Sequence, residues 1–147
     1  MGNNQEQLIQ FLCRAKKEVG AHNSVMSSRP NTQDYIYEQD EFKYMDTCLG
    51  NQQIVGEEAI WYQQQPVWGM NYTGRAVAEG FDADFLKEVL KRVTEEMPYR
   101  GPKYLELGDY TYQCRVEGAF DWFVGCEKIF YKGKKVYEAM FQGGNIQ

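Results

Sequence analysis

Two glutamates stand at positions where the sequence pattern predicts apolar side chains. Glu58 alternates with isoleucine, glycine and tyrosine residues along 54–62, and Glu127 alternates with similar residues along 123–131. Because successive side chains of a β-strand point to opposite faces, both carboxylates are expected on apolar faces, where a buried charge needs a partner. That partner is either structural, such as a backbone amide, Arg75 or Arg115, or a group of a bound ligand.

Asp46 is a third carboxylate on a strand face that is otherwise apolar, because it alternates with Tyr44 and Cys48. The residue 68 positions later is Cys114, so an acidic side chain occurs in only one of two similar stretches. This loss of similarity has two interpretations, a specialised site or sequence drift. Together with Glu58, Asp46 would form the carboxylate pair of a small acid–base enzyme.

Aromatic residues make up 15% of the chain, which is more than a core of this size needs. Trp68 and Tyr72 share one face of a predicted strand, and Asn71 between them points to the other face. Core packing explains these aromatics in one interpretation. In the other, Trp61, Trp68 and Tyr72 line a partly exposed cleft to which Asn71 adds a polar group.

The loop at about 20–31 has no counterpart in the second half of the chain. It contains His22, the only histidine, followed by three serines and Arg29. Loops that a scaffold does not require are frequent places for binding residues. We therefore keep two interpretations, a functional loop and an idle surface loop.

An internal similarity of the sequence predicts the helices and strands that position these residues. Residues 54–74 align without a gap with 123–143, at an offset of 69, and seven positions are identical. Upstream of each stretch, apolar residues at spacings 0, 3, 4, 7 and 11 predict amphipathic helices, one at 5–19 and one from Asp82 or Asp84 to Met97. Strands are expected near 35–38, 42–49, 53–62 and 67–73, and again near 103–107, 110–117, 121–131 and 136–142.

The predicted fold class is α+β, with a helix-plus-four-antiparallel-strand unit written twice. The 147 residues form a single domain with internal repeats at about 5–75 and 82–144. The two units are expected to share one large antiparallel sheet or to pack as two sheets. In shape alone, each αββββ unit resembles a cystatin-like unit.

Composition excludes several classes of function. The net charge of -5 gives no broad electrostatic footprint for nucleic acid, and no apolar run reaches the roughly 18 residues of a membrane span. The first residues are not a secretory signal, and the four cysteines form no CxxC motif, so we expect reduced thiols in a cytoplasmic protein. One histidine and scattered cysteines predict no metal site, and no cofactor motif is present.

The chain resembles an uncharacterised bacterial family, a domain of unknown function found alone or C-terminal to an Xre/Cro-type helix-turn-helix in putative transcription regulators. The resemblance rests on the following segments, which cover nearly the whole chain: FLCRAKK at 11–17, SSRPNTQDY at 27–35, DTCLGNQQIVGEEAIW at 46–61, PVWGMNYTGR at 66–75, EGFDADFLKEVL at 79–90, YRGP at 99–102 and YEAMFQGG at 137–144. It implies a cytoplasmic bacterial protein and supplies no catalytic residues. The two repeats use the whole chain, so we expect no direct nucleic-acid binding.

The sequence therefore favours a non-catalytic binding or sensor module for a small-molecule effector or a protein partner, with no cofactor and no membrane. Its candidate ligand-binding residues are Asp46, Glu58, Trp61, Trp68, Asn71, Tyr72, His22, Arg29 and Glu127. One alternative is a small enzyme that uses the carboxylate pair. The other is a purely structural dimerisation domain, a homodimer with a flat, exposed apolar face.

Overall fold

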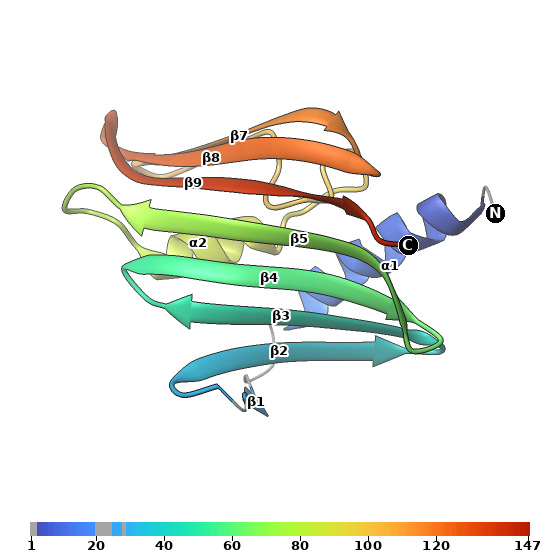
Figure 1. Cartoon of the computed structure of the whole chain (residues 1–147). Helices are drawn as coiled ribbons and strands as arrows, with labels where there is room; N and C mark the ends of the chain where they lie inside the picture. Colours follow the sequence, from blue (N-terminus) through green and yellow to red (C-terminus); the bar gives the residue numbers. More distant parts are fainter. Residues whose placement is uncertain (1–2, 20–24, 28) are drawn as a thin grey trace.

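The computed structural model describes residues 3–19, 25–27 and 29–147, and these form one curved antiparallel sheet with two helices (Figure 1). The elements are α1 (Asn3–Val19), β1 (Val25–Met26), β2 (Thr32–Gln39), β3 (Phe42–Gly50), β4 (Gln53–Tyr62), β5 (Gln65–Ala76), α2 (Ala83–Leu90), β6 (Tyr104–Leu107), β7 (Tyr110–Ala119), β8 (Trp122–Tyr131) and β9 (Lys134–Asn145). The strand order is β1-β2-β3-β4-β5-β9-β8-β7-β6. The last strand of the chain therefore lies in the middle of the sheet.

The prediction of two cystatin-like helix-plus-four-strand units is wrong. All the described strands belong to a single sheet, because β5 pairs with β9 from Trp68↔Asn145 to Ala76↔Tyr137. The pairing satisfies the backbone groups that two separate units would each leave exposed at a sheet edge. Helices and an antiparallel sheet are both present, but they do not form two helix-plus-four-strand units.

The second helix is shorter than the predicted one. Asp82 caps α2 by accepting a hydrogen bond from the Asp84 amide at 2.9 Å, but the helix ends at Leu90 instead of Met97. Beyond it, the Met97 amide donates to the Thr94 hydroxyl at 3.1 Å, a local bond that competes with helical hydrogen bonding. Residues 91–103 consequently form an irregular segment, although Val93 within it is buried.

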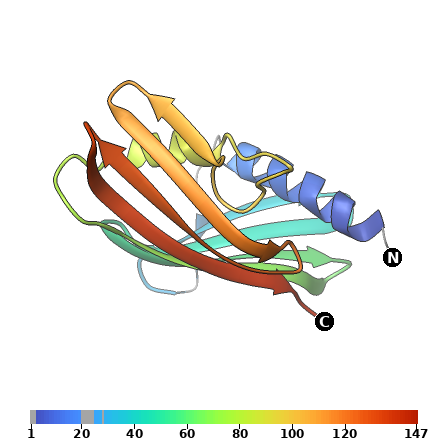
Figure 2. The ribbon, with the colours of Figure 1, turned by 90° about the horizontal axis from the view of Figure 1, so that it is seen from above.

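Both helices lie on the same side of the sheet, as the view from above shows (Figure 2). We call the helix-covered side the inner face and the opposite side the outer face. The core is on the inner face, where Phe11 of α1 stacks on Phe42 of β3 with ring centroids 5.0 Å apart. Burial of such aromatic and aliphatic surface is the main stabilising contribution to a fold of this kind.

Two glycines allow large aromatic rings to lie flat on the inner face. A Cβ atom on Gly56 would lie 2.1 Å from Cζ of Tyr72, and one on Gly125 would lie 2.4 Å from Cζ of Phe141. Each ring therefore occupies the space above a glycine of the neighbouring strand. No side chain larger than hydrogen fits beneath either ring.

Candidate functional site

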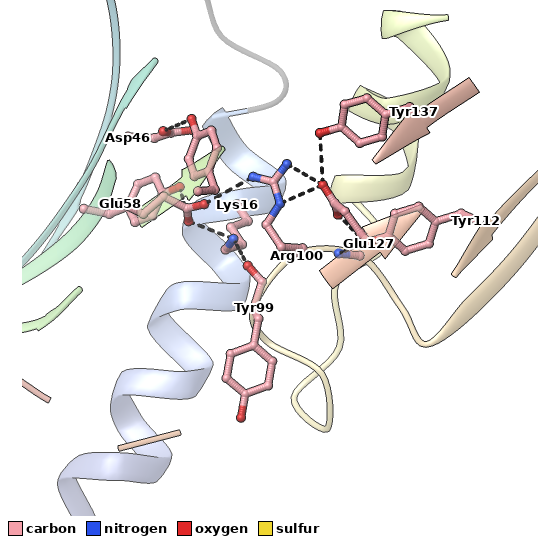
Figure 3. A network of polar contacts seen from close by, with 11 residues as sticks. Lys16, Asp46, Glu58, Tyr99, Arg100, Tyr112, Glu127 and Tyr137 are labelled. Atoms are coloured by element: carbon pink, nitrogen blue, oxygen red, sulfur yellow. Dashed lines mark hydrogen bonds and ion pairs between the residues drawn. The ribbon is translucent and has the colours of Figure 1, made fainter. Parts of the chain in front are cut away.

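A buried cluster of two cations and two glutamates lies at the centre of the inner face (Figure 3). Glu58 of β4 forms an ion pair with Lys16 of α1 at 2.7 Å, and Arg100 approaches its second carboxylate oxygen at 3.7 Å. Arg100 also donates from Nη2 and Nε to Oε1 of Glu127 on β8, at 2.8 and 3.1 Å. The cluster thus joins α1, β4, β8 and the irregular segment after α2.

Tyrosine hydroxyls complete the coordination of the two glutamates. Tyr44 donates to Glu58 at 2.8 Å, and Tyr112 donates to Glu127 at 2.5 Å. Tyr137 adds a second hydroxyl to Glu127 at 3.2 Å. Among the described residues every buried side-chain nitrogen and oxygen has a hydrogen-bond partner, which is what a stable buried polar cluster requires.

The charges of the cluster balance, which explains how they are tolerated in the core. Glu58 is 1% exposed and Glu127 0% exposed, so both carboxylates are removed from water. Burial opposes the charge of Arg100, but the two glutamates outweigh this and raise the pKa of the guanidinium well above its usual value. Arg100 therefore remains a cation, and the cluster acts as a structural connection between elements.

Asp46 is a third carboxylate beside this balanced cluster. It is the register partner of Glu58 across β3 and β4, and it accepts a hydrogen bond from the Tyr72 hydroxyl at 2.7 Å. Burial and the neighbouring Glu58 raise the pKa of Asp46 to about 7, although the bond from Tyr72 acts in the opposite direction. Arg100 lies 4.5 Å from the centroid of the Tyr72 ring and so contacts this residue through its ring face.

The structure divides the predicted ligand-binding residues between the two faces. Asp46, Glu58, Trp68, Tyr72 and Glu127 are on the inner face, and Trp68, at 0% exposed, packs parallel to Phe120. Trp61 and Asn71 are on the outer face. Arg29 is exposed in the connection between β1 and β2, and His22 is outside the described residues. These residues do not form one cleft.

The outer face carries large apolar side chains that no element covers in the described part of the chain. Apart from Tyr104 on the edge strand β6, at 55%, the most exposed are Trp122 at 81%, Met140 at 65%, Val55 at 57% and Val124 at 50%. They lie on the central strands β4, β9 and β8. The outer face is the better candidate for a binding surface, because the inner face is covered by the two helices and filled by the core.

Two hollows lie side by side on the outer face. The first, of about 730 Å³, is lined by Trp61, Met45 and the acidic residues of the β2–β3 hairpin. The second, of about 720 Å³, is lined by Ala59, Gly69, Trp122 and Ile146 among others. Met45 and Ala59 are register partners, so the two hollows meet between β3 and β4.

Comparison with known protein families gives a match over most of the chain. Residues 46–146 fit the family described as a domain of unknown function, DUF5680. The chain belongs to the DUF5680 family. The DUF5680 match confirms the resemblance to a domain of unknown function, and it includes Arg100, both buried glutamates and Trp122, whereas Lys16 precedes it. Comparison with curated proteins gives no match, and comparison with solved structures gives none.

In the DUF5680 chain a substrate would have limited access to the carboxylate pair, Asp46 and Glu58. Asp46 has the raised pKa of a candidate proton donor, but Glu58 is ion-paired and removed from water. A general acid–base pair must reach the reacting group of its substrate. Asp46 lines neither of the two outer hollows, and Glu58, which borders the second hollow, directs its carboxylate to the inner face.

Sequence reasoning missed the cationic partners of the glutamates. The suggested Arg75 lies on the outer face and pairs with Glu138 at 2.8 Å, and Arg115 also points outward. Lys16 had one visible signal, because it lies one helical turn after Leu12 on the apolar stripe of α1. Arg100 had none, since it belongs to an irregular segment whose side-chain directions follow no period.

No described helix has the length and apolar character needed to cross a bilayer. Within the described residues there is also no group of three or more acidic, histidine or cysteine side chains arranged to hold a metal ion. The four cysteines are free thiols, of which Cys13 and Cys114 are buried. Burial raises the pKa of the Cys114 thiol to about 12, which makes it a poor nucleophile.

Proposed function

We propose that this DUF5680 domain is a non-catalytic binding module that recognises a protein partner through the outer face of its sheet. The observation that carries the proposal is the group of exposed apolar residues on this face, with Trp122 81% exposed. Tryptophan is among the residues that contribute most to protein interfaces. A contiguous apolar patch on an uncovered sheet is typical of an interaction site.

The choice of a protein over a small effector rests on where the polar and apolar groups lie. On the inner face the polar groups of the cluster bind one another, and every buried side-chain nitrogen and oxygen of the described residues already has a partner within the protein. The outer face combines two open hollows with broad apolar surface. A surface of this extent matches a macromolecular partner better than a compact metabolite, which is normally enclosed.

The proposal includes the setting implied by the sequence resemblance, a bacterial cytoplasm and an association with transcription regulators. It assigns no direct nucleic-acid contact to this chain, because the hollows are lined by carboxylates and the net charge is -5. Phosphate backbones bind to basic surfaces.

Site-specific photo-crosslinking in the source cells tests the proposal. A photoreactive phenylalanine analogue at Val124 samples the outer face, and the same analogue at the exposed Lys87 of α2 samples the helix side. We expect an adduct of defined mass from position 124 only, and its loss when Met140→Glu is added. Equal adducts from both positions, or none from position 124, would refute the proposal.

A further inference from the structure

We infer that the docking element of the partner is a basic amphipathic helix that lies across the strands of the outer face. This inference rests on the proposed function, because it names the chemistry of the protein that binds there. It follows from three features of the outer face: an apolar row that crosses the strands, the continuity of the two hollows along that row, and carboxylates on both of its sides.

The apolar row follows directly from the strand register. Directly opposed residues point to the same face of a sheet. Beginning in β2 and ending in β7, the row consists of Ile36, Met45, Ala59, Gly69, Gly144, Trp122 and Ala119. The residues between Met45 and Trp122 are small, and at Gly69 the row is bordered by Ile146, whose Cδ1 atom would lie 3.2 Å from a Cβ atom on this glycine.

The hollows make this row a groove. The first hollow includes Met45 and the second includes Ala59, Gly69, Gly144 and Trp122, so together they follow the row without a break in register. Ile36 and Trp122 are five strand spacings apart, or about 24 Å. At 1.5 Å per residue this length fits a helix of roughly 16 residues.

Carboxylates flank the groove on both sides. One neighbouring row carries Asp34, Glu57 and Glu117, and the opposite side carries Glu38, Asp40 and Glu41 of the first hollow. The one basic side chain among these flanking positions is Lys43, which pairs with Glu38 at 3.6 Å, so Asp40 and Glu41 supply the net negative charge on that side. Arg75 and Lys135 lie farther along the strands and bind Glu138.

This arrangement is complementary to one kind of occupant. An amphipathic helix presents an apolar stripe with polar residues on both sides of it, and helices of this kind commonly dock in apolar grooves. Lysines or arginines beside the stripe would face the flanking carboxylates. A second copy of this acidic chain would bring like charges together over much of the same face, and an anionic membrane or nucleic acid would be repelled.

Binding of a designed peptide to the full chain tests the inference. The probe is a fluorescein-labelled helical peptide of about 16 residues, with leucine at helical spacing and lysine and alanine elsewhere. Its acidic counterpart replaces each lysine by glutamate. We expect fluorescence anisotropy to show saturable binding of the basic peptide only, weakened about 10-fold or more by Trp122→Ala, since exposed tryptophans are frequent hot spots.

Two matched charge-reversal variants distinguish an effect of the charges beside the groove from an effect of the net charge of the chain. Glu57→Lys with Glu117→Lys reverses two flanking charges, whereas Glu95→Lys with Glu96→Lys reverses two exposed charges after α2. The first pair should weaken binding about fivefold and the second much less, as expected for local surface ion pairs. If Trp122→Ala does not fold, Val124→Ser, at another exposed position, serves in its place.

Three results would overturn the inference: no binding of the basic peptide, equal weakening by both charge pairs, or full affinity in Trp122→Ala. Light scattering that shows a dimer of the chain dissociated by Trp122→Ala would assign the groove to a second copy. The proposed function fails separately, when position 124 gives no specific crosslink. A specific crosslink at 124 without peptide binding keeps the proposed function and rejects the helix.

Discussion

Replacing Asp46 by asparagine should stabilise the chain progressively as the pH rises. Burial and Glu58 raise the pKa of Asp46 from 3.8 to about 7 in the folded chain. Between these two values the unfolded chain releases the proton while the folded chain retains it, so the wild type loses stability as the pH rises through this window. Asparagine has no proton to lose and still offers an oxygen to the Tyr72 hydroxyl.

The size of the effect follows from the pKa difference. Three pKa units at about 1.4 kcal/mol each give about 4 kcal/mol for complete titration. The free energy of unfolding of Asp46→Asn should therefore exceed that of the wild type by about 1 kcal/mol at pH 4.5 and by up to about 4 kcal/mol at pH 8. Titrating groups that do not interact with Asp46 are common to both proteins and cancel in this difference.

Urea denaturation followed by fluorescence at several pH values between 4.5 and 8 measures this difference. Asp34→Asn is a suitable control, because Asp34 also accepts a hydroxyl hydrogen bond, from Thr47 at 2.7 Å, but on the outer face, between β2 and β3. A stability difference for Asp46→Asn that stays constant from pH 4.5 to 8 would refute the reasoning. It would show that Asp46 is ionised in the folded chain at much lower pH.

Two further predictions concern packing of the inner face. Glu127→Gln removes the charge that Arg100 binds, so it should lower the free energy of unfolding by about 3–5 kcal/mol in urea denaturation; a loss below about 1 kcal/mol would contradict a structural role of this ion pair. Gly56→Ala forces a methyl group against Tyr72 and should cost about 1–3 kcal/mol. Gly69→Ala on the outer face should cost less, because its Cβ would lie 3.2 Å from the flexible end of Ile146 and at ordinary contact distance, 3.4 Å, from the Glu58 carbonyl oxygen; equal losses would argue against the Tyr72 contact.

Local elements could be predicted from the sequence because their signals are local. The alternation around Glu58 predicted a strand at 53–62, which is the observed range of β4. The same alternation placed Glu58 and Glu127 on the apolar face, where both are buried. The end of α2 at Leu90 could not be predicted from periodicity, since the apolar spacing continues to Met97 while Thr94 bonds the backbone locally.

Contacts between distant parts of the chain could not be predicted from the sequence pattern. Nothing local distinguishes a β5 edge that pairs with β9 from one that is left open, because both strands show the same alternation. Arg100 and Lys16 converge on Glu58 only because the irregular segment and α1 pack on the same face. The groove required the register of six neighbouring strand pairs, which no single stretch of sequence contains.

The central position of β9 has a consequence for synthesis of the protein. β9 follows every other described strand in the chain, yet it lies between β5 and β8. While a ribosome is still making residues 134–145, β5 presents a twelve-residue edge with unpaired backbone groups, and the β6–β8 meander has a similar open edge at β8. Such edges readily pair with other chains. The nascent chain should therefore be most vulnerable to aggregation, and most dependent on chaperones, just before its last strand emerges.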